Sequence, residues 1–182
     1  MKKSITFITS SKDKLEQLRE FLDYPIEHKA LDLAEIQSLD PHEIVEAKVK
    51  EAYRIVKLPV LVEDVSLTFE AFGKLPGPLI KWFLKELDTE GLCKLLNGYS
   101  SRNATAYVLY GYYDGKVFKF FDGSWEGTIA KKPKGTYSFG WNPIFIPKGY
   151  NKTWGEMNLE EQKDTSMRKI ALDKFQKYLK TV

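Results

Sequence analysis

The sequence is poor in the residues that form disulfides and zinc sites. Its 182 residues include one cysteine, Cys93, and two histidines, His28 and His42. A single cysteine cannot form a disulfide within the chain, and the sequence offers no cluster of cysteine and histidine that could hold zinc. These absences indicate a protein of a reducing compartment without a zinc site.

Long hydrophobic runs and concentrated charge are also absent. No apolar run reaches the roughly 18 residues that a membrane-spanning helix needs, and the N-terminal residues lack the apolar core of a signal peptide. The formal net charge of +3 comes from 28 basic and 25 acidic residues spread along the chain, so no basic arm indicates a nucleic-acid or membrane partner. We therefore expect a cytoplasmic protein that binds neither nucleic acid nor membrane.

The residues that are present have the balance of an ordinary globular protein, with 43% hydrophobic and 29% charged residues. No internal repeat, low-complexity tract or linker divides the chain. At this length, residues 1–182 are most simply one domain that is long enough to bury a sizeable core.

Strand and helix patterns alternate in the first part of the chain. The β-branched and aromatic residues at 4–9 predict a short buried strand, and apolar residues at helical spacing follow the polar turn after it. Asp40 and Pro41 begin a helix that should end near Val56. Residues 60–62 then predict a central strand.

The later part of the chain continues this alternation. Its pattern comprises two short helices over 79–87 and 89–96, aromatic-rich strands over 104–113 and 116–125 joined by Asp114-Gly115, and a last helix from about Ser166. The whole order predicts an α/β fold, in which helices flank a mixed central β-sheet and a long antiparallel hairpin extends it.

Two adjacent acids, Glu63 and Asp64, follow the predicted strand over 60–62. The turn Pro76-Gly77-Pro78 then leads into a helix that carries Lys81. In open α/β sheets, ligands gather at the carboxyl ends of the strands. Acids that could hold a divalent cation therefore lie close in sequence to a lysine that could bind an anion, and this combination indicates phosphate chemistry.

The polar turn after the first strand carries Ser10, Ser11, Lys12 and Lys14. It places hydroxyls and backbone N–H groups at a helix N-terminus, where the helix dipole favours an anion. Spacing alone favours a simpler interpretation, in which a serine caps the helix and the lysines are solvated. A solvated acid is likewise the simplest interpretation of Glu35, in the connection to the next helix.

Taken in order, these segments resemble the inosine triphosphate pyrophosphatase family, whose members hydrolyse non-standard purine nucleoside triphosphates to the monophosphate and pyrophosphate. The resemblance extends over nearly the whole chain, from Phe7 to Leu179. Its most specific parts are Leu61-Val62-Glu63-Asp64, Leu75-Pro76-Gly77-Pro78, Ile80-Lys81-Trp82-Phe83, Phe139-Gly140-Trp141-Asn142-Pro143, and Glu156-Met157 followed by Ser166-Met167-Arg168. Such motifs in one order and at fitting distances are hard to obtain by chance.

The resemblance implies a homodimer that hydrolyses ITP, dITP or XTP in a cleft between two lobes and so cleanses the nucleotide pool. A nucleoside triphosphate brings several negative charges into the site, which Mg²⁺, or Mn²⁺ in its place, would offset. Asp64 matches the acid that binds the metal and is also proposed to activate water. Glu35 matches another metal ligand, and Glu63 is expected to support both acids in holding the metal.

The resemblance also assigns residues to the phosphates and sugar of the substrate. Lys48 and Lys81 match lysines that hold the triphosphate. In the turn that grips phosphate, Ser11 stands where the family usually has asparagine, so a hydroxyl replaces an amide. The residues expected at this part of the site are Thr9, Ser10, Ser11, Lys12, Lys14, Lys48, Val65 and Lys81.

The segment that matches the base pocket departs from the family pattern. Phe139 and Trp141 retain aromatic rings that stack on a purine. Asn142 replaces the usual aspartate, and Met167 replaces a histidine. Arg168 keeps the arginine that would donate to a 6-oxo group. The residues expected to contact the base are Phe139, Gly140, Trp141, Asn142, Gln162, Lys163, Met167 and Arg168.

Two further interpretations remain open. The first interpretation is the same reaction with an altered or broadened base preference. It is based on Asn142, Gln162 and Met167, which all differ from the family pattern at one subsite. A nucleotide-binding or partner-binding protein without turnover is the second. The retention of Glu35 and Asp64 together with the lysines argues against it, since a binding module would not need both.

Overall fold

A computed structural model of the chain describes residues 4–136 and 139–181. The chain divides into two compact units, each assembled from segments that are distant in the sequence. The first unit comprises Met1–Val65, Val108–Gly123 and Arg168–Val182, and the second comprises Ser66–Tyr107 and Ser124–Met167. The expectation of one domain over residues 1–182, with a cleft between two lobes, stays a prediction.

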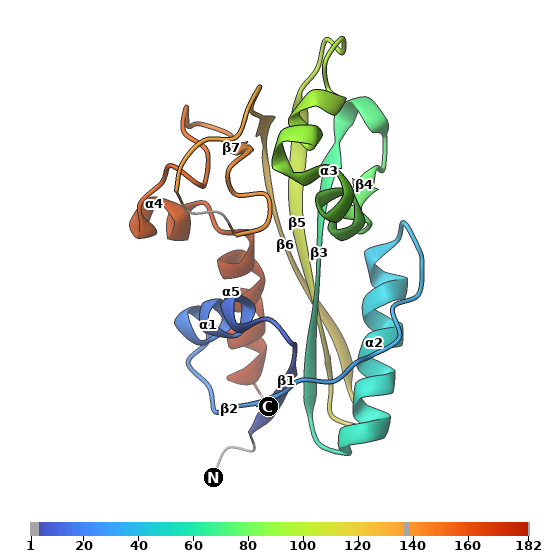
Figure 1. Cartoon of the computed structure of the whole chain (residues 1–182). Coiled ribbons are helices and arrows are strands. Elements are labelled where there is room, and N and C mark those ends of the chain that lie inside the picture. The colour runs from blue at the N-terminus through green and yellow to red at the C-terminus, as the bar shows by residue number, and fades with distance from the viewer. Residues whose placement is uncertain (1–3, 137–138, 182) are drawn as a thin grey trace. The chain divides into compact units, whose positions relative to one another are not determined.

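The strands form one mixed sheet. They are β1 (Ile5–Ile8), β2 (Ile26–Lys29), β3 (Val60–Phe69), β4 (Pro76–Gly77), β5 (Asn103–Tyr113), β6 (Phe118–Ile129) and β7 (Phe145–Pro147). Among the described residues the order is β2-β1-β3-β5-β6-β7, with β4 beside β3 (Figure 1). β1 is parallel to β2 and β3, whereas β4 and β7 are antiparallel to β3 and β6. The mixed sheet with its flanking helices confirms the predicted α/β fold.

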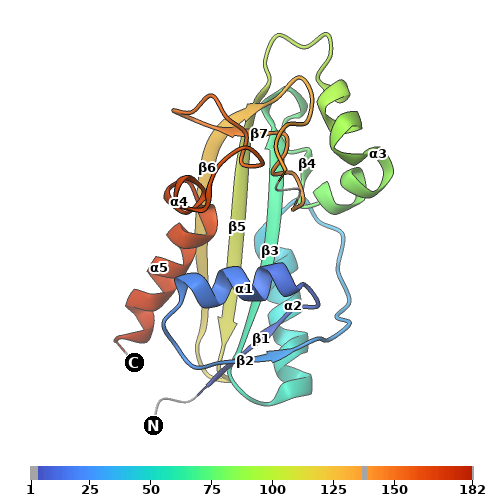
Figure 2. The ribbon, with the colours of Figure 1, turned by 60° about the vertical axis from the view of Figure 1, so that its left-hand side comes forward.

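The helices are α1 (Lys12–Phe21), α2 (Pro41–Val56), the short 3₁₀ helix η1 (Glu70–Phe72), α3 (Ile80–Leu95), α4 (Leu159–Asp164) and α5 (Met167–Leu179). In the first unit, α2 covers one face of the sheet, and α1 and α5 cover the other (Figures 1 and 2). None of the helices that the structure describes is long and apolar enough to cross a membrane.

Consecutive residues of β5 show how the first unit uses both faces of its sheet. A Cβ on Gly111 would collide with Val45 of α2. The next residue, Tyr112, points the other way, because its ring centroid lies 5.5 Å from that of Phe175 in α5. Side chains alternate along a strand, so neighbouring positions on β3 and β5 belong to different faces.

Helix α2 begins and ends where the sequence predicts. The Oδ1 atom of Asp40 accepts a hydrogen bond from the N–H of His42 at 2.9 Å, and Pro41 occupies the first turn. This cap satisfies a donor that has no partner within the helix, and proline is already shaped for that position. Lys48 is among the buried residues of α2, although its side chain is charged.

Helix α3, in the second unit, contains a break at Asp88. Its φ of 52° and ψ of −168° are not helical, and its Oδ1 atom accepts hydrogen bonds from Glu90 N–H at 2.7 Å and Gly91 N–H at 3.0 Å. The backbone of Asp88 therefore ends one helical segment, and its carboxylate caps the next. This confirms the prediction of two short helices on either side of Asp88.

Strands β5 and β6 are neighbours in the sheet, and residues 114–117 connect them. The sequence predicts that the second strand begins at Lys116. In the structure it begins at Phe118. The reason is that the N–H groups of Lys116 and Val117 donate to the Asp114 side chain, at 2.8 and 2.7 Å, instead of to a strand partner. Gly115 has a φ of 94°, which permits this tight turn.

Cys93 lies on α3 with no exposed surface. Burial raises the pKa of its thiol to about 11, although Arg102 nearby acts in the opposite direction. The thiol is therefore neutral and inaccessible at ordinary pH.

We expect the folded protein to react with an aromatic disulfide reagent at pH 8 at least about tenfold more slowly than the unfolded protein, because only an accessible thiolate attacks the reagent. Absorbance at the wavelength of the released thiolate measures both rates, and urea should expose one thiol per chain. Rapid release of one equivalent from the folded protein would contradict the burial of Cys93.

Candidate functional site

The adjacent acids of β3, Glu63 and Asp64, point to opposite faces of the sheet in the first unit. Glu63 contacts Arg168 of α5, whereas Asp64 contacts Lys48 of α2. The alternation of side chains along the strand produces this separation. Two acids that are neighbours in the sequence therefore belong to two different charged clusters.

The first of these, which we call the Lys48 cluster, consists of Glu35, Lys48 and Asp64. The Nζ atom of Lys48 lies 2.9 Å from Glu35 Oε1 and 2.8 Å from Asp64 Oδ1, so one ammonium group joins two carboxylates. The side chains of Lys48 and Asp64 are 10% and 13% exposed, while that of Glu35 is 47% exposed. The cluster thus lies at the surface on the Glu35 side and is buried on the Asp64 side.

Burial and charge act against each other in the Lys48 cluster. Burial alone would lower the pKa of Lys48, but the carboxylates of Asp64 and Glu35 outweigh it and raise the pKa above its usual value. Burial raises the pKa of Asp64 despite the attraction of Lys48. Its Oδ2 atom is buried and has no hydrogen-bond partner in the part of the chain that the structure describes. A buried oxygen of this kind is suited to bind a ligand or a proton.

The second cluster, the Glu63 cluster, consists of Lys14, Glu63, Tyr110 and Arg168. Arg168 donates from Nη2 to Glu63 Oε1 at 3.0 Å and from Nε to Oε2 at 3.3 Å. The Tyr110 hydroxyl donates to Oε2 at 2.6 Å, and Lys14 Nζ lies 3.1 Å from Oε1. Glu63 therefore connects α1, β5 and α5, with 1% of its side chain exposed.

Glu63 remains ionised in this buried position. Burial opposes the charged form, but the guanidinium of Arg168 and the ammonium of Lys14 outweigh it and lower the pKa of Glu63 to about 2. Burial and the neighbouring carboxylate raise the pKa of Tyr110 well above its usual value, so this hydroxyl stays a donor. The Glu63 cluster is thus satisfied by charge and by hydrogen bonds.

The turn before α1 uses its hydroxyl groups locally. Ser11 Oγ accepts a hydrogen bond from Lys14 N–H at 3.3 Å and caps the helix, and Thr9 Oγ1 accepts one from Ser11 N–H at 3.1 Å. The simpler interpretation of Ser11 as a cap is therefore correct. Ser10 is exposed, as the phosphate-binding prediction requires, whereas Lys14 reaches inward to Glu63.

Lys81 and the residues predicted to contact the base, except Arg168, lie in the second unit. Lys81 is exposed in the first turn of α3, where the helix dipole also favours an anion. Phe139 and Asn142 occupy half-buried positions on either side of Gly140 and Trp141. Trp141 is only 7% exposed, and its Nε1–H has no acceptor among the residues described. Its ring is packed inside the second unit.

Three residues predicted to read the base are buried in the protein or hydrogen-bonded to it. Gln162 donates from Nε2 to the carbonyl groups of Trp154 and Met157, at 3.0 and 2.9 Å. Met167 is 3% exposed, and Arg168 is held by Glu63. Gln162 therefore fixes the preceding loop, and its amide hydrogens are occupied.

Tyr110 is a member of the site that sequence reasoning misses. Strand β5 carries several tyrosines, and Tyr110 is distinguished from the others by the hydrogen bond that its hydroxyl donates to Glu63. The alternation along β5 gives its face, but the position of β5 beside β3 is not readable from the sequence.

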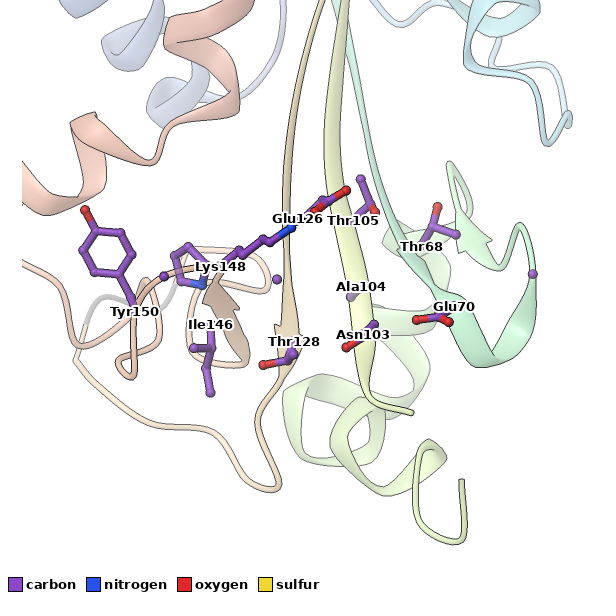
Figure 3. A pocket seen from close by; sticks show the side chains of 14 residues that line it. Thr68, Glu70, Asn103, Ala104, Thr105, Glu126, Thr128, Ile146, Lys148 and Tyr150 are labelled. Atoms are coloured by element: carbon purple, nitrogen blue, oxygen red, sulfur yellow. Dashed lines mark hydrogen bonds and ion pairs between the residues drawn. The ribbon is translucent and has the colours of Figure 1, made fainter. Parts of the chain in front are cut away.

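A hollow of about 700 Å³ in the second unit has none of the predicted site residues in its lining (Figure 3). Strands β3, β5, β6 and β7 contribute to it, with Asn103, Thr128 and Tyr150 among its side chains. Lys148 and Glu126 form an exposed ion pair at its rim, at 2.7 Å. The acids and lysines expected to carry phosphate chemistry lie elsewhere.

Two carboxylates, rather than three, are placed to hold a metal ion in the first unit. Over residues 4–136 and 139–181, no group of three or more His, Cys, Asp or Glu side chains lies close enough together for one ion. Glu35 and Asp64 both contact the ammonium group of Lys48, whereas Glu63 faces the other side of the sheet. The structure does not bring Glu63 beside these two carboxylates, and the expectation that it supports the metal stays a prediction. One or two carboxylates with phosphate oxygens and water suit Mg²⁺, so the Glu35 and Asp64 pair fits this ion.

Comparison with known proteins gives a consistent result. Residues 5–178 match the model of the Ham1 family. The chain is 36% identical over 185 residues to an inosine triphosphate pyrophosphatase of Puccinia graminis f. sp. tritici, and the alignment covers 96% of this chain and 95% of the relative.

Solved structures share the fold. A Ham1 protein of Staphylococcus aureus superposes with a TM-score of 0.87 at 22% identity, over 98% of this chain and 99% of that one. A HAM1 protein of Coxiella burnetii also gives 0.87, at 23% identity over 100% of both chains. A nucleoside-triphosphatase, or dITP/XTP pyrophosphatase, of Mycobacterium abscessus gives 0.77 at 22% identity, over 94% and 98%.

We expect the substitution Glu63→Gln to lower the free energy of unfolding at pH 7 by about 3 kcal/mol, since it leaves buried cations without their anion. The fall in pKa from 4.5 to about 2 gives a similar magnitude. Because the folded pKa lies below the unfolded value, this contribution is present above pH 4.5 and is lost as the pH falls towards 2. Urea unfolding should show that the difference from wild type shrinks by about 1 kcal/mol between pH 7 and pH 3.5.

The exposed pair of Asp122 and Lys174 provides a matched control in the same unit. Asp122→Asn should change the free energy of unfolding by less than about 0.5 kcal/mol at either pH. If Glu63→Gln behaved like Asp122→Asn, the Glu63 cluster would not stabilise the fold.

Proposed function

Because the chain belongs to the Ham1 family, we propose that it hydrolyses non-standard purine nucleoside triphosphates such as ITP, dITP and XTP to the monophosphate and pyrophosphate. The observation that carries this proposal is the Lys48 cluster. Its two carboxylates and one ammonium group combine the ligands of a hard metal ion with the counter-charge of a phosphate. The relative from Puccinia graminis, named an inosine triphosphate pyrophosphatase, supports the substrate class.

The proposed reaction needs positive charge around the phosphate chain. Lys48 offers one ammonium group at the Lys48 cluster, and the family resemblance assigns Lys81 to the triphosphate as well. Glu35 and Asp64 would hold Mg²⁺, or Mn²⁺ in its place, which when bound offsets charge on phosphate oxygens. With the phosphates positioned in this way, water attacks the α-phosphorus and pyrophosphate leaves.

Asp64 is the residue proposed to accept the proton of the attacking water. Its buried Oδ2 atom has no other partner in the described chain, so it is available to a ligand. Burial raises the pKa of this carboxyl, which makes Asp64 a stronger base than an exposed aspartate. In the structure, Lys48 binds the opposite oxygen, Oδ1, at 2.8 Å.

In the second unit, Phe139 and Asn142 are the residues proposed to recognise the base. Both are half-buried, and the phenyl ring can stack on any purine. Gln162 and Arg168 donate to protein groups, so fewer donors are left to distinguish a 6-oxo purine. This occupation favours a second candidate, the same reaction with a broadened base preference.

The remaining proposals come from the family resemblance. They are dependence on Mg²⁺, a homodimer, and a cytoplasmic location in which the enzyme cleanses the nucleotide pool. Light scattering after size exclusion should give a mass of twice 21.0 kDa for the homodimer. A mass equal to one chain would overturn this part of the proposal.

We expect pyrophosphate release from ITP, dITP or XTP in the presence of Mg²⁺ or Mn²⁺. Asp64→Asn should lower kcat by about 100-fold or more, because the amide cannot take a proton. A coupled phosphate assay after inorganic pyrophosphatase treatment measures the release. Asp122→Asn is the matched control and should keep full activity, while circular dichroism confirms that each variant folds.

Two outcomes would contradict these assignments in different ways. Full activity in folded Asp64→Asn would remove Asp64 from the reaction. A lack of release from every standard and non-standard triphosphate, with either metal ion, would favour a nucleotide-binding protein without turnover.

The change Asn142→Asp tests the base preference. Aspartate only accepts hydrogen bonds, so it should favour the N1–H donor of inosine over the N1 acceptor of adenine. We expect the ratio of kcat/KM for ITP to kcat/KM for ATP to rise by about tenfold. Steady-state kinetics on both substrates gives the ratio, and an unchanged ratio would show that Asn142 does not contact the base.

A further inference from the structure

The ammonium group of Lys48 binds the same two carboxylates that are proposed to bind the metal ion. Its Nζ atom lies within 2.9 Å of an oxygen of Glu35 and an oxygen of Asp64. Ion pairs at this distance, with two of the three side chains mostly buried, are much less screened than pairs at the surface. Any other cation at these oxygens must compete with Lys48.

The same lysine has a second anion available when the substrate is bound. On the proposed function, Lys48 holds the triphosphate, whose oxygens carry more negative charge than the two carboxylates together. Lysine binds phosphate as a mobile point charge at the end of a flexible side chain, so its ammonium group can exchange one anion for another. The carboxylate pair and the triphosphate therefore compete for the single positive charge of Lys48.

We propose that Lys48 keeps divalent cations off Glu35 and Asp64 until a triphosphate draws its ammonium group away. This inference rests on the proposed function, because it takes the triphosphate as the competing anion. Without Lys48 the two carboxylates would carry two negative charges and no counter-charge of their own. Metal ions would then bind them before the nucleotide arrives, and the normal order of binding would be lost.

The test measures Mn²⁺ binding to the nucleotide-free protein by electron paramagnetic resonance of the free ion. Lys48→Met removes the charge and keeps an unbranched side chain. We expect it to bind Mn²⁺ about tenfold more tightly than wild type, or more, since a positive charge beside the ion is removed. The variant should also bind the uncleavable analogue α,β-methylene ITP more weakly in calorimetry with a chelator present.

Lys50→Met is the matched control, because Lys50 lies on the same helix with 65% of its side chain exposed and pairs with Glu46. Its Mn²⁺ affinity should equal that of wild type. If Lys48→Met fails to fold, Lys48→Gln gives the same test, since the amide removes the charge but still donates to a carboxylate. Adding Asp64→Asn to either variant should abolish the gain, which would locate the ion at the Lys48 cluster.

Equal or weaker Mn²⁺ binding in the folded Lys48 variants would overturn the inference. This result is independent of the proposed function, because the measurement needs neither substrate nor turnover. A wild-type protein that releases pyrophosphate but whose Lys48 variants bind Mn²⁺ no more tightly would keep the function and reject the competition. If the wild-type protein showed no turnover but the Lys48 variants bound Mn²⁺ more tightly, the competition would be kept and the proposed function rejected.

Discussion

The alternation of side chains along β3 is the constraint on which the charged structure of the first unit depends. It directs Glu63 towards α1 and α5, and it directs Asp64 towards α2. A buried carboxylate without a partner would cost several kcal/mol, so each acid requires its own cation on its own face. Arg168 meets this need on one side and Lys48 on the other. One dipeptide thus organises two clusters of different character.

The two clusters differ in how completely they are satisfied. The carboxylate of Glu63 is enclosed, accepts hydrogen bonds from β5 and α5 and forms an ion pair with α1, and a group in this state holds the fold together. The Lys48 cluster is open on the side of Glu35 and leaves Oδ2 of Asp64 without a partner in the described chain. Incomplete satisfaction of this kind is expected where ligands bind and protons move. On the proposed function, stability and chemistry therefore belong to opposite faces of one strand.

The sequence predicts features that depend on neighbouring residues. The cap at Asp40 and the break at Asp88 are local patterns, and the structure contains both. The face of Glu63 and the role of Tyr110 depend on which strands and helices pack together, and a motif of adjacent acids does not contain this information. Family resemblance likewise places Gln162 at the base pocket, but not the two carbonyl groups that occupy its amide. Long-range packing decides these roles.

The separation of the two acids can be tested directly by a crystal structure with Mn²⁺ and α,β-methylene ITP. The anomalous signal of Mn²⁺ locates the ion without reference to any assumed role. We predict one peak bonded to Asp64 and Glu35, with the Nζ atom of Lys48 moved from Asp64 to a phosphate oxygen, and with Glu63 still bound to Arg168. A manganese ion bonded to Glu63, or a Lys48 that still joins the two carboxylates beside a bound ion, would contradict the account.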